Sequence, residues 1–539
     1  LALQVSSRQQ RADNAQKSPG TAKIPGDFFY QFFVGPFVEL GSGFASAGTG
    51  DATWIEDIVA TVDGFVWGPI MILLLLGTHI FMTFRTGFIQ RKIPQGIKLS
   101  VAKDSGSGDV SPFAALTTSL AATIGTGNII GVGTALIAGG PGAIFWMWIT
   151  GVFGIATKYS ETLIAVKYRV KDHNGNMLGG AMYALQRGFK RKKLGKVLGI
   201  LFAVFAAIAS FGIGAAVQAN SLSGAIVSVS GSAGIAEANI DVFGLFMTSP
   251  LQIIVGIILV VLIAVVIVGG IKVISRVCEK LIPAMTIFYV FACLVLIIIN
   301  GQYFLDAIGL IVVCAFTPQA AFGGAVGTSI MIALQLGCAR GLFSNESGLG
   351  SSPLVASSAI TRNPARQALV SMTGTFWDTV VVCALTGIAL VSSILASPEI
   401  AASFNDGSFL GATATLVTAC FSQIPVVGPI VLCIGLVLFA YSTMVGWSYY
   451  GNRCITYLFG KHAIRPYQIV FLVICFLGAI GLQGFVWDIS DITNALMAVP
   501  NLIAVLGLSA LIARETKHYV WGNRLDEEDT TPIPIEESK

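Results

Sequence analysis

The stretch Ala122–Gly131, which reads ATIGTGNIIG, interrupts a long apolar segment with small and polar residues. The run that contains it, residues 113–138, has no charged residue and is long enough to cross a bilayer as a helix. Two glycines, a threonine and Asn128 weaken that helix at its centre, where unpaired backbone groups in hydrocarbon cost several kcal/mol each. The stretch therefore predicts either close packing of helices or a helix that is broken to bind a ligand.

The composition of the whole chain indicates a membrane protein. Of its 539 residues, 54% are hydrophobic and 11% are charged, and the mean hydropathy is +0.79. Soluble domains carry about 25% charged residues. The nine cysteines are scattered without a CxxC pair, and the four histidines lie far apart in the sequence. We therefore expect no disulfide framework, no transition-metal site and no cofactor, and we expect lipid rather than nucleic acid as a partner.

Eleven apolar runs have about the 20 residues that a membrane-spanning helix needs. The expected fold class is an all-α polytopic membrane protein. The predicted spans are 64–84, 113–138, 142–166, 197–224, 252–272, 281–300, 308–336, 368–392, 426–450, 467–487 and 493–513.

Basic residues alternate between the connections of these spans. The connections after the odd-numbered spans hold three to nine Lys plus Arg each, whereas those after spans 2, 4, 6, 8 and 10 hold none. The positive-inside rule then puts the N-terminus outside and the C-terminus in the cytoplasm of a cell whose plasma (inner) membrane the chain spans. We expect residues 1–53 to be a partly disordered extension, residues 54–515 to be the transmembrane domain and residues 516–539 to be a cytoplasmic tail.

A second interruption lies in the seventh predicted span. Residues 318–327 read PQAAFGGAVG, with a proline and three glycines that disfavour a regular helix. Spans 2–6 and 7–11 are two sets of five, so the second set would be inverted relative to the first. Interrupted spans at matching positions of inverted halves indicate the binding site of a secondary transporter. A dinucleotide-binding fingerprint is excluded, because the third glycine of the first stretch is one position late and no strand precedes it.

Three segments of the chain resemble the alanine or glycine:cation symporters, also called sodium:alanine symporters. They are residues 117–142 (TTSLAATIGTGNIIGVGTALIAGGPG), 321–350 (AFGGAVGTSIMIALQLGCARGLFSNESGLG) and 439–451 (FAYSTMVGWSYYG), and the resemblance extends over about residues 54–515. It implies eleven helices, with spans 2–11 forming the inverted five-plus-five core of the neurotransmitter:sodium symporters.

The resemblance also implies a set of binding residues. For the substrate these are Gly125, Thr126, Gly127, Asn128, Gln218, Phe322, Gly323 and Gly324; for a sodium ion they are the backbone oxygens of Thr123 and Ile124, together with Asn128 and the hydroxyls of Ser442 and Thr443.

Each of these assignments has an alternative in ordinary membrane-protein structure. In the alternative interpretation, the hydroxyls of Ser442 and Thr443 donate hydrogen bonds to a backbone carbonyl of their own helix. Gln218 alternatively joins two helices by a hydrogen bond. Phe322 alternatively packs in the core, and Gly127-x-x-x-Gly131 alternatively lets two helices approach closely.

A few charged residues fall inside predicted spans. Asp378 lies in the middle of the eighth, where a carboxylate costs on the order of 2.5–3.5 kcal/mol and needs a partner. We assign it to the cation site, with proton coupling or a structural ion pair as alternatives. Lys158 and Glu161 lie on one face of the third span, where we expect a salt bridge or gate. Asn345 and Glu346 are expected on the cytoplasmic side.

The function predicted from these features is sodium-coupled symport of a small neutral amino acid, L-alanine or glycine, by alternating access. Proton coupling and other substrates, namely serine or glutamine, remain alternatives. A channel would need a ring of equivalent polar groups, a membrane enzyme would need reactive residues clustered at one depth, and a nutrient receptor would need a large cytosolic domain. The sequence shows none of these features, so we expect a transporter and not an enzyme.

Overall fold

The computed structural model describes residues 54–232, 240–242, 246–317, 330–425, 427–481 and 485–535. All of them belong to one compact unit, Ala52–Lys539, which is built mainly from helices. The predicted extension, residues 1–53, lies outside the described residues.

The elements of the first half run from α4 to α14 in chain order. They are α4 (Trp54–Val66), α5 (Pro69–Arg85), η2 (Ile89–Lys92), α6 (Ile93–Ser100), α7 (Pro112–Thr123), η3 (Thr126–Asn128), α8 (Ile130–Gly139), α9 (Pro141–Lys167), β1 (Val170–Lys171), β2 (Met177–Leu178), α10 (Ala181–Gly188), α11 (Lys192–Phe211), η4 (Gly212–Ala216), α12 (Val217–Ser232), β3 (Ile240–Val242), β4 (Phe246–Thr248), α13 (Pro250–Ile267) and α14 (Gly270–Ile299). Strand β1 pairs with β2, and β3 pairs with β4, as two short antiparallel hairpins.

In the part that the structure describes, every named element of the second half is a helix. Its elements are η5 (Gly301–Tyr303), α15 (Phe304–Cys314), α16 (Ile330–Asn345), α17 (Pro353–Ala356), α18 (Pro364–Thr375), η6 (Phe376–Cys383), α19 (Ala384–Ala396), α20 (Pro398–Asn405), α21 (Thr413–Phe421), α22 (Gly428–Phe459), η7 (Lys461–Ala463), α23 (Ile464–Ala479), α24 (Phe485–Gly507), α25 (Ser509–Glu515) and η8 (Thr516–Trp521).

Several helices begin at a Ser-Pro or Asn-Pro pair, and the sequence explains why. Proline fits the first helical position, where its missing N–H would have no partner, and the preceding side chain accepts one of the free backbone N–H groups. Ser111, for example, accepts a hydrogen bond from the backbone N–H of Ala114 at 3.0 Å, and Asn363 accepts one from Arg366 at 3.0 Å. The pairs Ser249-Pro250 and Ser397-Pro398 start α13 and α20 in the same way.

Eight helices in the described part are long and apolar enough to cross a membrane, judged by length and composition. The chain is therefore a multi-pass membrane protein. Two predicted spans are absent from this set. Span 113–138 is absent because α7 and α8 are the two short halves of a broken helix. Span 142–166 corresponds to α9, whose apolar character is lowered by the buried Lys158 and Glu161. The eight are Gly64–Arg85, Lys192–Ser230, Pro250–Ile267, Gly270–Ile299, Pro364–Ala396, Gly428–Phe459, Lys461–Ala479 and Ile489–Gly507.

The seventh predicted span, 308–336, is wrong as one continuous helix. Helix α15 ends at Cys314, turn residues follow it, and α16 begins at Ile330 and continues to Asn345. The predicted interruption at 318–327 lies outside the described residues. The apolar run therefore joins part of one helix to the start of another, because hydropathy alone does not register where a helix begins.

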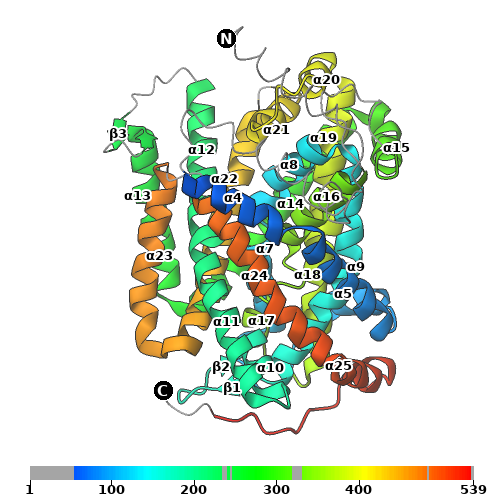
Figure 1. The fold of residues 1–539 in the computed structure, drawn as a ribbon, viewed down its shortest axis with the longest axis vertical. Helices are drawn as coiled ribbons and strands as arrows, with labels where there is room; N and C mark the ends of the chain where they lie inside the picture. The colour runs from blue at the N-terminus through cyan, green and yellow to red at the C-terminus, as the bar shows by residue number, and fades with distance from the viewer. Residues whose placement is uncertain are drawn as a thin grey trace, which may run out of the picture. The chain divides into compact units, whose positions relative to one another are not determined.

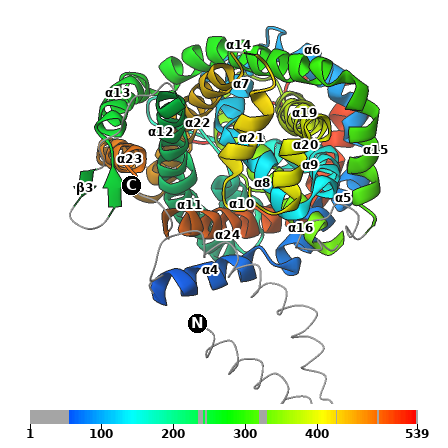
Figure 2. The same cartoon turned by 90° about the horizontal axis from the view of Figure 1, so that it is seen from above.

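The two ends of the helical unit differ in the connections that they carry. Helix α10, the β1–β2 hairpin and α25 lie at the same end as the C-terminus, whereas α20, α21 and β3 lie at the opposite end (Figure 1). Seen from above, α13, α14 and α15 lie at the periphery, and α8 lies inside (Figure 2). Ile257, Val261 and Val265 of α13 are exposed, as expected for side chains that face lipid.

Two sets of five helical units follow α4–α6 in the chain. The first comprises α7/α8, α9, α11/α12, α13 and α14, and the second comprises α16/α17, α18/α19, α22, α23 and α24. Each set opens with a broken helix. Within the sets, η4 and η6 are π-helical turns in the middle of longer helices, a distortion that is often found at functional sites.

Candidate functional site

The first helix break lies where the sequence predicts it. Helix α7 ends at Thr123, and the backbone leaves the helical region at Ile124, with ψ 94°, and at Gly125, with φ −140° and ψ −158°. A single 3₁₀ turn at Thr126–Asn128 precedes α8. Because the chain is extended at Ile124 and Gly125, the carbonyls of the last turn of α7 have no helical N–H four residues onward. The break thus presents carbonyl oxygens on one side and amide N–H groups on the other.

Asn128 connects this break to the buried carboxylate of Asp378. Its Oδ1 accepts a hydrogen bond from the backbone N–H of Gly125 at 2.8 Å, and its Nδ2 donates to Asp378 Oδ1 at 2.7 Å. Asp378 lies on the π-helical turn η6, and both residues are wholly buried. The predicted association of Asn128 with Asp378 in one site is therefore present in the structure, across 250 residues of sequence.

Two hydroxyl groups complete the hydrogen bonding of this carboxylate. Ser344 donates to Asp378 Oδ2 at 2.9 Å from the end of α16, and Thr379 donates to the same oxygen at 2.7 Å. Among the described residues, Asp378 forms hydrogen bonds but no salt bridge. With three hydrogen-bond donors and no salt bridge in the described part, this buried carboxylate is suited to a small hard cation.

Helix α22 lies directly against the first break. A Cβ added to Gly446 would come within 2.7 Å of the Ala122 backbone nitrogen, and one added to Gly125 would come within 2.4 Å of Thr443 Oγ1. The hydroxyls of Ser442 and Thr443 donate to the carbonyl of Phe439 at 2.9 and 3.0 Å, as the alternative interpretation predicted. Their oxygen lone pairs can still accept or ligate, because a hydroxyl that donates once keeps its acceptor capacity.

Gln218 also reaches the break, from just beyond the π-helical turn η4. Its Oε1 accepts a hydrogen bond from Thr126 Oγ1 at 3.1 Å, and it is buried. A Cβ on Gly127 would meet the ring of Phe343 at 3.1 Å, so this side of the break is also closely packed.

A second break follows α16, at a position that sequence reasoning missed. The chain stops being helical after Asn345, and Glu346, Gly348 and Gly350 have left-handed φ values of 55°, 94° and 78° before α17 starts at Pro353. Asn345 and Glu346 are both buried; their expected place on the cytoplasmic side stays a prediction. The signal was present in the Ser347–Ser351 stretch SGLGS, because glycine is the residue that adopts left-handed φ without strain.

The two breaks lie next to each other. Ser352, at the start of α17, hydrogen-bonds to Ser119 of α7, and Asn345 donates to Thr379 Oγ1 at 3.0 Å beside Asp378. Phe322, Gly323 and Gly324, which were predicted to form the second break, lie outside the described residues.

The second break is stabilised by hydrogen bonds to the backbone N–H and carbonyl of Gly348. Its N–H donates to Glu161 Oε2 at 3.2 Å, and its carbonyl accepts from Asn501 Nδ2 at 2.8 Å; Asn501 also donates to Glu161 Oε2 at 2.9 Å. The predicted ion pair of Lys158 with Glu161 is present, with 3.5 Å between Nζ and Oε1, and both side chains are buried. This pair therefore supports the break and does not line an opening to the surface.

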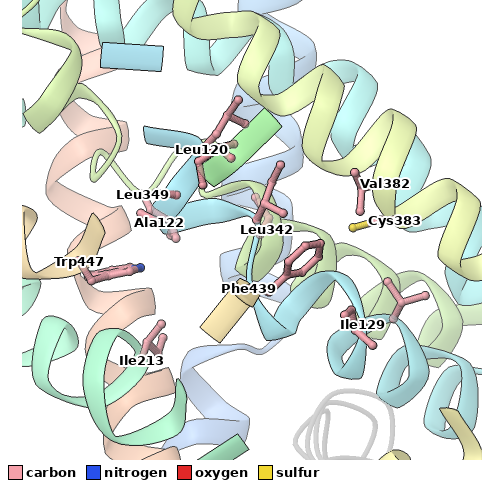
Figure 3. Close-up of a cluster of buried hydrophobic side chains, with 14 of the residues drawn as sticks. Leu120, Ala122, Ile129, Ile213, Leu342, Leu349, Val382, Cys383, Phe439 and Trp447 are labelled. Carbon is pink, nitrogen blue, oxygen red and sulfur yellow. The ribbon is translucent and has the colours of Figure 1, made fainter. Parts of the chain in front are cut away.

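Apolar side chains from several elements surround the two breaks. Figure 3 shows Leu120 and Ala122 of α7, Leu349 of the second break, Cys383 of η6 and Trp447 of α22 gathered in one buried cluster. Such surroundings strengthen the electrostatic interactions of any charge held between the breaks, because water is excluded.

The described site thus joins most of the predicted residues. Thr123, Ile124, Gly125, Thr126, Gly127, Asn128, Gln218, Asp378, Ser442 and Thr443 are all buried, on α7–η3, η6, α22 and the start of α12.

Comparison with known proteins identifies the group to which this arrangement is similar. A family model described as "Sodium:alanine symporter family" matches residues 52–532. The "Sodium/alanine symporter AgcS" of Methanococcus maripaludis is 47% identical over 467 residues, which is 86% of this chain and 96% of that protein. The "Probable sodium/glutamine symporter GlnT" of Bacillus subtilis is 32% identical over 471 residues, 86% of this chain and 91% of that protein.

A solved structure shares the fold. The crystal structure of MhsT in complex with L-phenylalanine matches with a TM-score of 0.54 at 15% sequence identity, over 78% of this chain and 95% of that chain. The predicted fold class, an all-α membrane protein with a core of the neurotransmitter:sodium symporter type, is therefore confirmed. The number of eleven helices stays a prediction.

Proposed function

Because the chain belongs to the sodium:alanine symporter family, we propose that it carries a small neutral amino acid, L-alanine or glycine, into the cell together with sodium. The main support is the carboxylate of Asp378, which is buried beside the first helix break and has three hydrogen-bond donors but no salt bridge among the described residues. A buried carboxylate is unfavourable without a counter-charge, and a bound sodium ion supplies one. In this proposal sodium is cargo, and no covalent chemistry takes place.

Two cation positions fit the chemistry of the site. The first is beside Asp378 and Asn128, where carboxylate and amide oxygens meet. The second is between α7 and α22, where the break after Thr123 adjoins the helix that carries Ser442 and Thr443. Sodium at this second position would join α7 to α22 and so favour the conformation that accepts substrate.

We assign the amino acid to the break itself. The N–H groups at the start of η3 and α8 suit the substrate carboxylate, because a helix N-terminus presents free donors and a positive dipole end. Gly125 and Gly127 are packed against Thr443 and Phe343, so the space beside them is small. A small side chain such as that of alanine fits this environment best.

The orientation follows from the basic connections. The connection after α9 and the start of α11 carry eight Lys plus Arg, and the strand β1 of this connection lies at the same end of the unit as α25 (Figure 1). We assign this end to the cytoplasm and the α20–α21 end to the outside of the plasma membrane. Sodium entry is then driven by the membrane potential, which supplies about 2.3 kcal/mol per charge per 100 mV.

Uptake by purified protein in liposomes tests the proposal. Labelled alanine should accumulate when sodium is outside and should not accumulate when potassium replaces it. Asp378→Asn and Asn128→Ala should each lower uptake by about 10- to 100-fold, which corresponds to the 1.5–3 kcal/mol of a lost hydrogen bond to a charged group.

A carboxylate away from the site gives the matched control. Glu399 is exposed at the α20 end, and Glu399→Gln should keep normal uptake. Accumulation driven by a proton gradient in the absence of sodium would support proton coupling instead. Normal sodium-driven uptake by both site variants would refute the assignment of the site.

A further inference from the structure

The chain after η8 crosses the end of the helical unit that we assign to the cytoplasm, as an extended segment. We call residues 522–535 the C-terminal strap; in Figure 1 it is the red trace that leads from α25 to the C-terminal marker. Leu525 is buried in a hydrophobic cluster, whereas most of the strap is exposed. Apart from Leu525, the strap is therefore held mainly by polar contacts.

The strap is hydrogen-bonded to three separate segments. Asn363, at the start of α18, donates to the carbonyls of Leu525 and Glu527 at 2.8 and 2.9 Å. Asp529 accepts from Lys167 Nζ, at the end of α9, at 2.7 Å. Beyond it, the N–H of Lys171 in β1 donates to the carbonyl of Pro534 at 2.8 Å.

Asp529 is well suited to a permanent ion pair. Burial on its own would raise the pKa of this carboxyl, but hydrogen bonds from Lys167 and Thr531 outweigh it and lower the pKa below its usual range. The carboxylate is therefore ionised throughout the physiological pH range.

The segment that leads into α7, residues 104–110, is also joined to the start of α18. Asp104 forms salt bridges with Arg362 at 3.1 Å and with Arg366 at 2.9 Å, and its side chain is only 1% exposed. Arg169 donates to the carbonyl of Ser107 at 2.8 Å, and the N–H of Ile360 donates to the carbonyl of Val110 at 2.8 Å. The entry to α7 is therefore joined to α9 and to the α17–α18 connection.

The strap and the entry to α7 share the same two arginines. Arg366 contacts Asp526 at 2.8 Å through Nη1 while its Nε contacts Asp104, and Arg362 contacts Asp526 at 3.4 Å. Two guanidinium groups and two carboxylates thus form a balanced cluster. Asp526, whose side chain is 83% exposed, is the strap's contribution to it, so both arginines that bind Asp104 also contact the strap.

Helix α7 connects this cluster of charged residues to the candidate site. Helix α7 runs from the strap end of the molecule to the first break, and its Ser119 touches Ser352 at the second break. Opening the site toward this end requires α7 to separate from α17 and α18. Such a movement pulls Asp104 away from the arginines that the strap orients.

We propose that the C-terminal strap is a latch that holds the cytoplasmic end of the transporter closed by fixing Arg362 and Arg366 on Asp104 at the entry to α7. A cavity of about 60 Å³ lies under the strap and is lined by Lys167, Arg362 and Asp529 among others, so the strap docks here on a largely polar surface. Release of the strap would favour the conformation that opens inward.

Cysteine labelling from the cytoplasmic side tests the latch. Ser119→Cys places a thiol between α7 and α17, which is buried when the end is closed. A membrane-impermeant maleimide added to inside-out vesicles reports how often it becomes accessible, and vesicles with the unmodified chain give the background of its nine free thiols. In the Ser119→Cys chain, Asp526→Asn should raise the labelling rate about two- to fivefold, and ending the chain after Trp521 should raise it further.

Matched variants make the result specific to the latch. Glu528→Gln removes the same charge from an exposed strap residue for which the structure shows no ion pair, and it should label at the parent rate, as should Asp526→Glu. Parent-rate labelling in both Asp526→Asn and the shortened chain would overturn the proposal. The inference rests on the proposed alternating access, but labelling does not depend on transport: failure of sodium-driven uptake in the parent would refute the proposed function alone.

Discussion

Two glycines of one short stretch have opposite surroundings, although the sequence gives no means of telling them apart. Gly125 is pressed against Thr443 and Gln218, with 2.4 Å from its hypothetical Cβ to the Thr443 hydroxyl, whereas at Gly131 no atom of the described residues outside the helix's own backbone lies within 4 Å of that position. The first glycine is therefore required by a close approach of two segments. Within the part of the chain that the structure describes, Gly131 makes no such close approach.

Substitution by alanine at each glycine makes this difference measurable. Gly125→Ala should reduce sodium-driven alanine uptake by at least about tenfold, because overpacking of about 1–3 kcal/mol falls on the site itself. Gly131→Ala should leave uptake unchanged and stabilise α8 slightly, by about 0.5–1 kcal/mol, since alanine is the better helix former. Equal uptake by the two variants would contradict the proposed contact of Gly125 with the site.

At the scale of elements, the two helix breaks are stabilised by different means. The first is held by the side chain of Asn128, which bonds back to Gly125. The second is held from outside, by Glu161 of α9 and Asn501 of α24, which grip the two peptide groups of Gly348. Lys158 completes this support as the buried counter-ion of Glu161.

Thermal unfolding in detergent tests the role of the buried pair. Glu161→Gln keeps an acceptor for Gly348 but leaves Lys158 charged and unpaired, so we expect a loss of about 3–5 kcal/mol of unfolding free energy. The double variant Lys158→Met/Glu161→Gln should recover much of this loss, because neither position then carries a buried charge that has lost its partner. A double variant that is less stable than Glu161→Gln would show that Lys158 has another partner.

At the scale of the whole molecule, the alternation of basic connections predicts which end faces the cytoplasm. Lys193, which follows α10 at the start of α11, and Glu399, in α20, are both exposed. Helices α10 and α20 lie at opposite ends of the unit (Figure 1). In cells, a cysteine at position 399 should react with an impermeant reagent added outside, and a cysteine at position 193 should react only after the membrane is opened. The reverse pattern would invert the proposed direction of transport and the side on which the strap lies.

The sequence indicated much of the fold and about one half of the site. Apolar runs gave most of the helices, and the first break was predicted at the residues where it occurs, because glycine and Asn128 weaken a helix locally. The seventh span was misjudged, since hydropathy averages over a window and cannot separate the end of α15 from the start of α16. The break predicted at the proline and glycines of 318–327 lies outside the described residues and stays a prediction. The break that the structure describes, at the SGLGS stretch of 347–351 with its left-handed glycines, was not predicted.

The sequence by itself determined that the chain crosses a membrane, that basic residues mark one side, and that one helix is interrupted at Gly125–Asn128. These properties depend on local composition and on backbone preference, which are readable from neighbouring residues. Only the tertiary structure decided that Asn128 meets Asp378, that Glu161 and Asn501 hold Gly348, and that Asp526 shares its arginines with Asp104. Such contacts join residues that lie up to several hundred positions apart, and the packing of whole helices, which no local pattern encodes, brings them together.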